Sequence, residues 1–242
     1  MYTLTIMTLE IANKILPVLR NKLMGFALAG GTALSKYYFK HRESFDLDFF
    51  SKQGGFSKEQ AEKIIDEIRN QLSVSIKLVD EKNQVGLVRM LIYIVKIDTE
   101  TEYKIDFVED YVDLQSSLNN FDGIPVYSLV DIYLRKIITV TGHVKSEDMV
   151  GRDLMVGGRQ EAKDFYDLYF LSTRHLQISD FVSGLGDRYK EALINWYNTF
   201  DRISMKTGVL DLIADDPVEF PIIDKHFKEQ IDKILEAQIG DI

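Results

Sequence analysis

Residues 29–50 read AGGTALSKYYFKHRESFDLDFF, and this stretch decides the fold. Within it, FDLDFF at 45–50 alternates apolar and acidic residues with a period of two, which is typical of a half-buried strand. Asp46 and Asp48 therefore share one face, roughly 7 Å apart at Cα. The opposite face is expected to enter the core with Phe45, Leu47 and Phe49. Two carboxylates this close repel each other unless a cation lies between them.

A further carboxylate lies on a second alternating run, YKIDFV at 103–108, which contains Asp106. Magnesium takes a few protein oxygens and keeps its other positions for water and substrate phosphates, so a third aspartate on a neighbouring strand would complete a two-metal cage. Ordinary alternatives exist for each part. The Asp-x-Asp pair also fits the solvated face of an edge strand, and Asp106 also fits a salt bridge to Lys104.

The glycine pair precedes these carboxylates. FALAG at 26–30 is typical of a buried strand, and we expect Gly30 and Gly31 to turn the chain into a helix that begins at Thr32. Such a turn presents backbone N–H groups at the positive end of the helix dipole, where phosphate binds well. Thr32 would add a hydroxyl or cap the helix. A Gly-Gly pair is often only a turn, but its place before Asp-x-Asp indicates nucleotidyl transfer.

The rest of the chain predicts an α+β fold, a mixed sheet flanked by helices and followed by a helical C-terminal domain. In the first half, the expected helices cover about 8–23 and 58–72, the second capped by Ser57, and further strands are expected at 74–79, 85–95 and 103–108. In the second half, helices are expected from Ser128, over 161–174 and through most of the tail, with a polar loop over 142–158. The predicted domains are therefore 1–125 and 126–242.

Composition narrows the class of protein. The chain has 242 residues, enough for one large or two small domains, and a net charge of −9 from 29 basic and 38 acidic residues. This acidic balance argues against a simple nucleic-acid coat protein, although a local basic patch can still bind RNA. The absence of cysteine excludes disulfides, thiol nucleophiles and cysteine zinc sites. No apolar run reaches about 18 residues and the N-terminus is a poor signal peptide, so we expect a cytoplasmic protein without membrane partners.

The stretch at 29–50 resembles the N-terminal signature of the AbiEii/AbiGii toxins, nucleotidyltransferases of the DNA polymerase β-like superfamily. The matching positions are Gly30, Gly31, Thr32, Ala33, Leu34, His41, Arg42, Ser44, Asp46, Asp48 and Phe49. A second matching block supplies Lys136, Arg159, Lys163, Asp164 and Asp167. The resemblance spans about residues 25–172, and the remaining tail matches only in being helical.

The resemblance implies a role for each of these positions. The implied metal ligands are Asp46, Asp48 and Asp106, the last also helping to deprotonate the acceptor. The implied nucleotide-binding residues are Gly30, Gly31, Thr32, Arg42, Lys136 and Arg159. Asp164 would orient Lys136 or the nucleotide, and Arg152, in a long loop, competes with Arg159 for its role. Each of these residues also has a structural explanation. Lys136 could be a solvated helix lysine, Lys163 and Asp167 could form an exposed ion pair, and His41 could have a structural role.

The function implied is that of a Mg²⁺-dependent nucleotidyltransferase that moves a nucleoside monophosphate from a nucleoside triphosphate to an acceptor. By resemblance the acceptor is RNA, with a tRNA 3′ end as the candidate, and the protein is the toxin of a toxin–antitoxin pair with a cognate antitoxin. A basic cluster supports RNA and comprises Lys136, Lys145, Arg152, Arg159 and Lys163. The alternatives are an enzyme that modifies an antibiotic, and an inactive fold that binds proteins.

Overall fold

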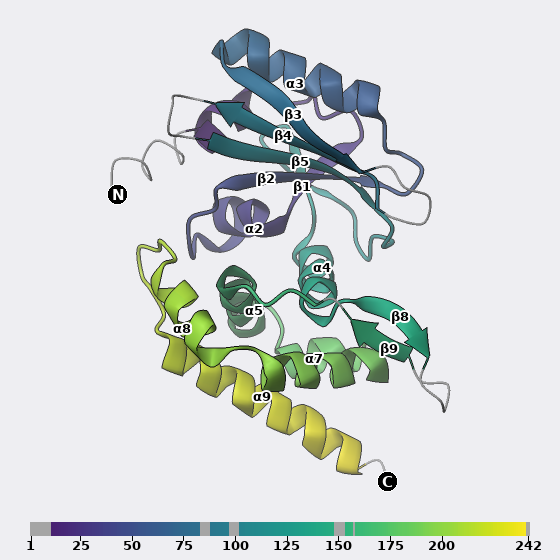
Figure 1. Cartoon of the computed structure of the whole chain (residues 1–242), viewed down its shortest axis with the longest axis vertical. Helices are drawn as coiled ribbons and strands as arrows, with labels where there is room; N and C mark the ends of the chain where they lie inside the picture. Colours follow the sequence, from purple (N-terminus) through teal and green to yellow (C-terminus); the bar gives the residue numbers. More distant parts are fainter. Residues whose placement is uncertain (1–10, 83–87, 97–101, 148–152, 157, 241–242) are drawn as a thin grey trace. The chain divides into compact units, whose positions relative to one another are not determined.

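The computed structural model describes residues 11–82, 88–96, 102–147, 153–156 and 158–240 (Figure 1). The chain divides into two compact units, Met1–Asp131 and Ile132–Ile242, called unit 1 and unit 2 below. The predicted domain boundary at residue 125 lies in a strand of unit 1. Among the helices of the described residues, none combines the length and the apolar character needed to cross a lipid bilayer.

Unit 1 is built on one mixed seven-stranded sheet with the order β3-β4-β5-β2-β1-β7-β6. The β2–β5 and β1–β7 pairs are parallel and the other pairs are antiparallel, so the predicted mixed sheet is confirmed. The strands are β1 (Phe26–Ala29), β2 (Asp46–Lys52), β3 (Ser75–Lys82), β4 (Met90–Lys96), β5 (Glu102–Asp110), β6 (Asn119–Phe121) and β7 (Ile124–Val126). A helix over residues 11–18 precedes β1.

Helix α3 (Lys58–Leu72) covers one face of this sheet (Figure 1). Its first turn is capped as predicted, because the Ser57 side chain accepts a hydrogen bond from the Gln60 backbone N–H. Leu47, Phe49 and Phe107 are fully buried, in agreement with the alternation that the sequence shows. The prediction was wrong for Phe45, which precedes the strand and is 39% exposed.

The glycine pair lies inside a helix rather than in a turn before one. Helix α2 (Gly30–Ala33) begins at the first glycine and continues directly as a π-helix, η1 (Leu34–Phe39). The predicted start at Thr32 was therefore two residues late. Gly30 has a φ of +67°, a left-handed value that glycine adopts without the steric cost of a side chain.

Two short strand pairs were not predicted. β6 and β7 form a hairpin whose second strand joins the sheet beside β1, and both strands are only three residues long, too short for a periodic signal. The region 142–158, predicted to be a loop, contains β8 (His143–Glu147) and β9 (Asp153–Val156), which pair antiparallel.

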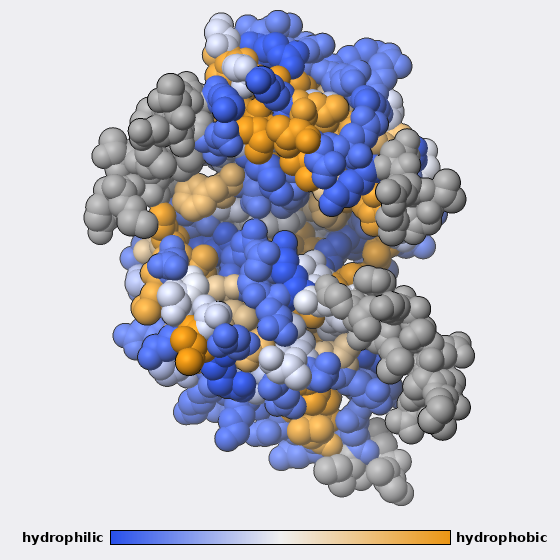
Figure 2. All heavy atoms as spheres, in the orientation of Figure 1, coloured by the Kyte–Doolittle hydropathy of each residue, from blue (hydrophilic) through white to orange (hydrophobic). Residues whose placement is uncertain are grey.

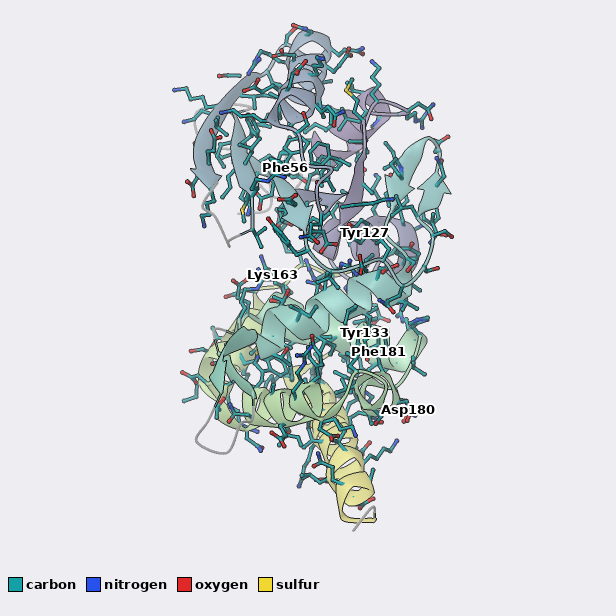
Figure 3. The ribbon with its side chains drawn as sticks, turned by 90° about the vertical axis from the view of Figure 1, so that its right-hand side faces the viewer. Phe56, Tyr127, Tyr133, Lys163, Asp180 and Phe181 are labelled. Atoms are coloured by element: carbon teal, nitrogen blue, oxygen red, sulfur yellow. The ribbon has the colours of Figure 1, made fainter. Side chains whose placement is uncertain are left out.

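Unit 2 is mainly helical, as the sequence predicts. Its helices are α4 (Leu129–Thr141, which begins in unit 1), α5 (Ala162–Arg174), α6 (Ile178–Ser183), α7 (Asp187–Thr199), α8 (Arg202–Leu210) and α9 (Phe220–Gly240). The Tyr133 and Phe181 rings stack with centroids 4.0 Å apart, joining α4 to α6 (Figure 3). Phe165 stacks on Phe227 of α9 at 4.6 Å. Phe165 on α5 is therefore part of the core of unit 2.

Strand β3 forms one edge of the sheet and departs from regular pairing. Its register against β4 shifts between Leu78 and Asp80, so that Val79 is an extra residue in the ladder. Val79 is 56% exposed and Leu78 is 40% exposed. Figure 2 shows apolar surface over β3 and β4, bordered by hydrophilic residues.

Replacing Phe107 with alanine is expected to lower the free energy of unfolding by about 3–5 kcal/mol, because a fully buried ring leaves a cavity. Phe107 packs against Phe26 with centroids 4.9 Å apart and against Phe49 at 5.5 Å. Urea unfolding followed by circular dichroism measures the change. The control is Phe45→Ala, where an exposed ring is lost and less than about 1 kcal/mol is expected. Equal losses in the two variants would contradict the assignment of Phe107 to the core.

Candidate functional site

The parallel pairing of β2 with β5 places the predicted carboxylates side by side. In this register Asp48 is the direct neighbour of Asp106, and Asp46 is the direct neighbour of Lys104. Cross-strand neighbours point to the same face of a sheet, and so do residues two apart on one strand. The four side chains therefore form a two-by-two group on one face, called the Asp–Lys quartet below. The opposite face of these strands carries the buried Leu47, Phe49, Ile105 and Phe107.

Two carboxylates of the quartet make polar contacts with other side chains, Asp106 with Lys104 and Asp46 with Ser44. Asp106 Oδ2 lies 2.5 Å from Lys104 Nζ, the ion pair that the sequence offers as an alternative to metal binding. Asp46 Oδ1 accepts a hydrogen bond of 3.1 Å from Ser44 Oγ. Burial lowers the pKa of the Lys104 ammonium, but its hydrogen bond to Asp106 and the charges of the three carboxylates outweigh burial and leave its pKa raised.

A side chain at either glycine would collide with a neighbouring charged group. A Cβ on Gly30 would lie 2.2 Å from Asp48 Oδ2, and a Cβ on Gly31 would lie 2.5 Å from Arg42 Nη2. Side-chain carbon atoms do not approach other atoms so closely, so any larger residue would displace the carboxylate or the guanidinium. The glycine pair thus brings the start of α2 directly against Asp48 and Arg42.

The other residues around the glycine pair have structural contacts. The Thr32 hydroxyl donates to the backbone oxygen of Asp46, which ties α2 to β2, and no side chain caps α2. Arg42 is buried and donates to the Glu43 backbone oxygen at 2.8 Å. His41 is buried with its ring edge-on to Phe39, as expected for a structural side chain.

The carboxylates of the quartet do not form a ready-made metal cage. Within the described ranges, no group of three or more histidine, aspartate or glutamate side chains is placed to hold a metal ion together. The donor types are nevertheless those that magnesium prefers, and the lack of a Cβ at Gly30 lets Asp48 Oδ2 lie directly against the start of α2. The residues therefore fit a divalent cation if Asp106 changes its partner.

In unit 2, the residues of the second block form a buried ion cluster. Lys136 Nζ lies 2.8 Å from Asp164 Oδ1 and 2.6 Å from Asp167 Oδ2. Arg159 donates twice to Asp164, with Nε 2.5 Å from Oδ2 and Nη2 2.7 Å from Oδ1. Both aspartate side chains are fully buried and Lys136 is 7% exposed, whereas Arg159 is 40% exposed. The structure thus brings Lys136, Arg159 and Asp164 together in one ion cluster.

Arg159 is also fixed through its backbone. Its N–H donates to the Thr139 oxygen at 2.8 Å, and its own oxygen accepts from Trp196 Nε1 at 3.0 Å. Arg152, the competing candidate, lies outside the described residues. Lys163 lies 3.2 Å from Glu161, and Asp167 is too deeply buried for the exposed Lys163–Asp167 pair considered from the sequence.

The electrostatics of Asp164 follow from these contacts. Burial raises the pKa of the carboxyl, but the charge of Lys136 and the hydrogen bonds and charge of Arg159 outweigh it. The net effect lowers the pKa of Asp164 below its ordinary value. Asp164 therefore stays ionised in the folded protein and its two cations remain paired.

Sequence reasoning missed two residues of the site, Lys104 as a member of the quartet and Ser44 as a partner of Asp46. Lys104 was visible only as a salt-bridge alternative for Asp106. Its position two residues before Asp106 on an alternating strand was the available signal, because it places both on one face. Its place beside Asp46 depended on the β2–β5 register, which no local pattern gives.

The comparisons with known proteins agree with this geometry. Residues 19–241 match the model of the family described as nucleotidyl transferase AbiEii toxin, Type IV TA system. The chain belongs to this family. No curated protein matches the chain. As an AbiEii family member it is a nucleotidyltransferase of toxin–antitoxin type, which confirms the predicted enzyme class and the resemblance.

Two solved structures from Helicobacter pylori share the fold. The structure of JHP933 superposes with a TM-score of 0.50 at 18% identity, covering 94% of this chain and 94% of that one. A second protein, provisionally described as a nucleotidyltransferase, gives a TM-score of 0.54 at 18% identity, covering 95% of this chain and 97% of that one. At this identity the likeness concerns the fold, and it confirms the predicted α+β class.

Gly30→Ala is expected to reduce nucleotidyl transfer by about 100-fold, because the new Cβ displaces the Asp48 carboxylate from its position. The control is Gly54→Ala. Gly54 also has a left-handed φ, +75°, but a Cβ there meets nothing within 4 Å. Both variants share the backbone strain of about 1 kcal/mol, so thermal denaturation should shift in both and activity should fall only in the first. Full activity of Gly30→Ala would contradict the role of this close approach.

Asp164→Asn is expected to destabilise the protein by about 3–5 kcal/mol near neutral pH, since it leaves buried cations uncompensated. The folded pKa of Asp164 is lowered from 3.8, so the stability it contributes is present above that value and is lost as the pH falls through the folded pKa. Urea unfolding of both proteins between about pH 7 and pH 3 should therefore show a shrinking difference. The control is Asp180→Asn at an exposed position, where the free energy of unfolding is expected to fall by about 1 kcal/mol or less. A constant difference for Asp164→Asn would contradict the ionised, paired state.

Proposed function

We propose that this nucleotidyltransferase transfers a nucleoside monophosphate from a nucleoside triphosphate to an RNA hydroxyl with Mg²⁺, releasing pyrophosphate. The observation that carries the proposal is the register that sets Asp48 beside Asp106, with Asp46 on the same face. Three carboxylates on one face of a sheet repel one another, and bound cations would offset this repulsion. In this proposal Asp46, Asp48 and Asp106 hold the metal.

When bound, divalent ions supply charge neutralisation for the triphosphate and acidify the attacking hydroxyl. The remaining tasks fall to the chain itself. We assign to Asp106 the removal of the proton from the acceptor hydroxyl, because its strand lies next to β2 and its carboxylate adjoins that of Asp48. The backbone N–H groups of Gly30 and Gly31 begin a helical segment that no side chain caps, which supports their assignment to phosphate. Arg42 lies against Gly31 and adds a positive charge there.

In unit 2 the exposures suggest a division of roles. Arg159 is 40% exposed, so its guanidinium is assigned the contact with the triphosphate. Lys136 is 7% exposed and is held between two buried aspartates, so its part is to fix Asp164, which in turn orients Arg159. In this assignment Lys136, Asp164 and Arg159 all serve nucleotide binding, with Lys136 as a positioning residue.

The proposed RNA acceptor, with a tRNA 3′ end as the candidate, rests on the toxin family and on local charge. Lys136 is too deeply buried to offer surface charge to RNA. The helical segment after the glycine pair carries a half-buried Lys36 and ends at an exposed Lys40, with Tyr37 half-buried between them. Lysines interleaved with aromatic rings suit single-stranded RNA, because cations contact its backbone and rings stack on its bases. A cognate antitoxin follows from the toxin family.

The test incubates the purified protein with Mg²⁺ and each α-labelled nucleoside triphosphate, together with total tRNA, a panel of antibiotics or no acceptor. Label is expected on tRNA, with a loss of about 100-fold or more in Asp46→Asn, since a metal ligand is removed. The control variant is Asp66→Asn on α3, an exposed aspartate away from β2 and β5. Label on an antibiotic would overturn the RNA acceptor but keep the carboxylate site. Equal activity of Asp46→Asn would overturn the site itself.

A further inference from the structure

The Asp–Lys quartet contains one cation among three anions. Lys104 is the cross-strand neighbour of Asp46, and its ammonium lies 2.5 Å from Asp106 Oδ2. The four groups together carry a net charge of −2 rather than the −3 of the aspartates alone. Lys104 thus lies in the same field that would attract a divalent cation.

We propose that Lys104 is a resident counter-ion of the metal site, and that its ammonium must leave Asp106 before this carboxylate can bind a metal. The inference deepens the proposed function, on whose Mg²⁺ site it rests. It assigns Lys104 the role of a positioning residue that holds Asp106 in the metal-free protein and sets the affinity for divalent cations.

The exposures of the two partners support an exchange of partners. The Asp106 side chain is 9% exposed and sits on a strand inside the sheet, so it has little freedom to move. The Lys104 side chain is 41% exposed, so its long flexible stem can carry the ammonium into solvent. An exchange therefore requires only a rotamer change of the lysine, while the carboxylate keeps its place beside Asp48.

A second lysine on the same sheet shows what an ordinary ion pair looks like. Lys96 on β4 lies 2.9 Å from Glu102 on β5, with side chains 50% and 52% exposed. Such a pair is screened by water on both sides and contributes little. The Lys104–Asp106 pair differs because its carboxylate is nearly buried and two further aspartates adjoin it. Loss of Lys104 would remove one positive charge from beside these three negative ones and so increase the repulsion among them.

The experiment measures binding of Mn²⁺ by the full-length protein, using titration calorimetry and the electron paramagnetic resonance signal of free Mn²⁺. The variants are Lys104→Met, Lys104→Arg and the charge-loss control Lys96→Met. Lys104→Met is expected to bind Mn²⁺ about 10-fold more tightly, because a competing unit charge within a few ångströms is removed. Lys104→Arg keeps the charge, and Lys96→Met removes a charge from an exposed ion pair that water screens. Both are therefore expected to stay close to the wild-type affinity.

A second readout covers the metal-free state. In EDTA, Lys104→Met is expected to melt at a lower temperature than the wild type, and to gain more from added Mg²⁺, because binding to the folded state stabilises it. Unchanged or weaker Mn²⁺ affinity in Lys104→Met, with normal binding by the wild type, would overturn the inference alone. Absence of Mn²⁺ binding by all variants, with and without a non-hydrolysable nucleoside triphosphate, would overturn the metal site and the inference with it.

Discussion

The parallel pairing of β2 with β5 is the constraint on which the rest of the site depends. It forces the like charges of Asp48 and Asp106 together, an arrangement that is unfavourable by itself. The strands cannot separate to relieve it, because Leu47 and Phe107 on their other face are fully buried in the core. The hydrophobic core therefore supplies the free energy that holds a repulsive polar face in place. The lack of a side chain at Gly30 follows from the same constraint, since Asp48 occupies the space beside it.

In unit 2, buried aspartates form ion pairs with nearby cations. Its two buried aspartates have partners on other elements, with Lys136 on α4 and Arg159 in the segment before α5. Buried ion pairs of this kind contribute little net stability compared with apolar packing, but loss of one partner is costly. The cluster is therefore best understood as a device that fixes the relative position of α4, α5 and the Arg159 backbone. The hydrogen bond from Trp196 to the Arg159 oxygen extends this network to α7.

Much of unit 1 was predictable because its signals are local. Alternation identified β2 and β5, and the Ser57–Gln60 spacing identified the start of α3. The signals failed where the decisive contact is distant in sequence. The three-residue β6 and β7 owe their pairing to neighbours, and the quartet depends on a register between residues far apart in the chain. The glycines were read as a turn, because their need for space became visible only with Asp48 and Arg42 in place.

The irregular β3 strand has a consequence for how the protein behaves at high concentration. An edge strand offers unpaired backbone groups along which another chain can add, and exposed Leu78 and Val79 would favour such stacking. The extra residue between Leu78 and Asp80 breaks the spacing of those groups, so an incoming regular strand cannot match them along the full edge. Lys77, Asp80, Glu81 and Lys82 add charges that oppose close sheet-to-sheet contact. The extra residue Val79 and the charged neighbours of β3 therefore oppose fibrous aggregation along this edge of the sheet.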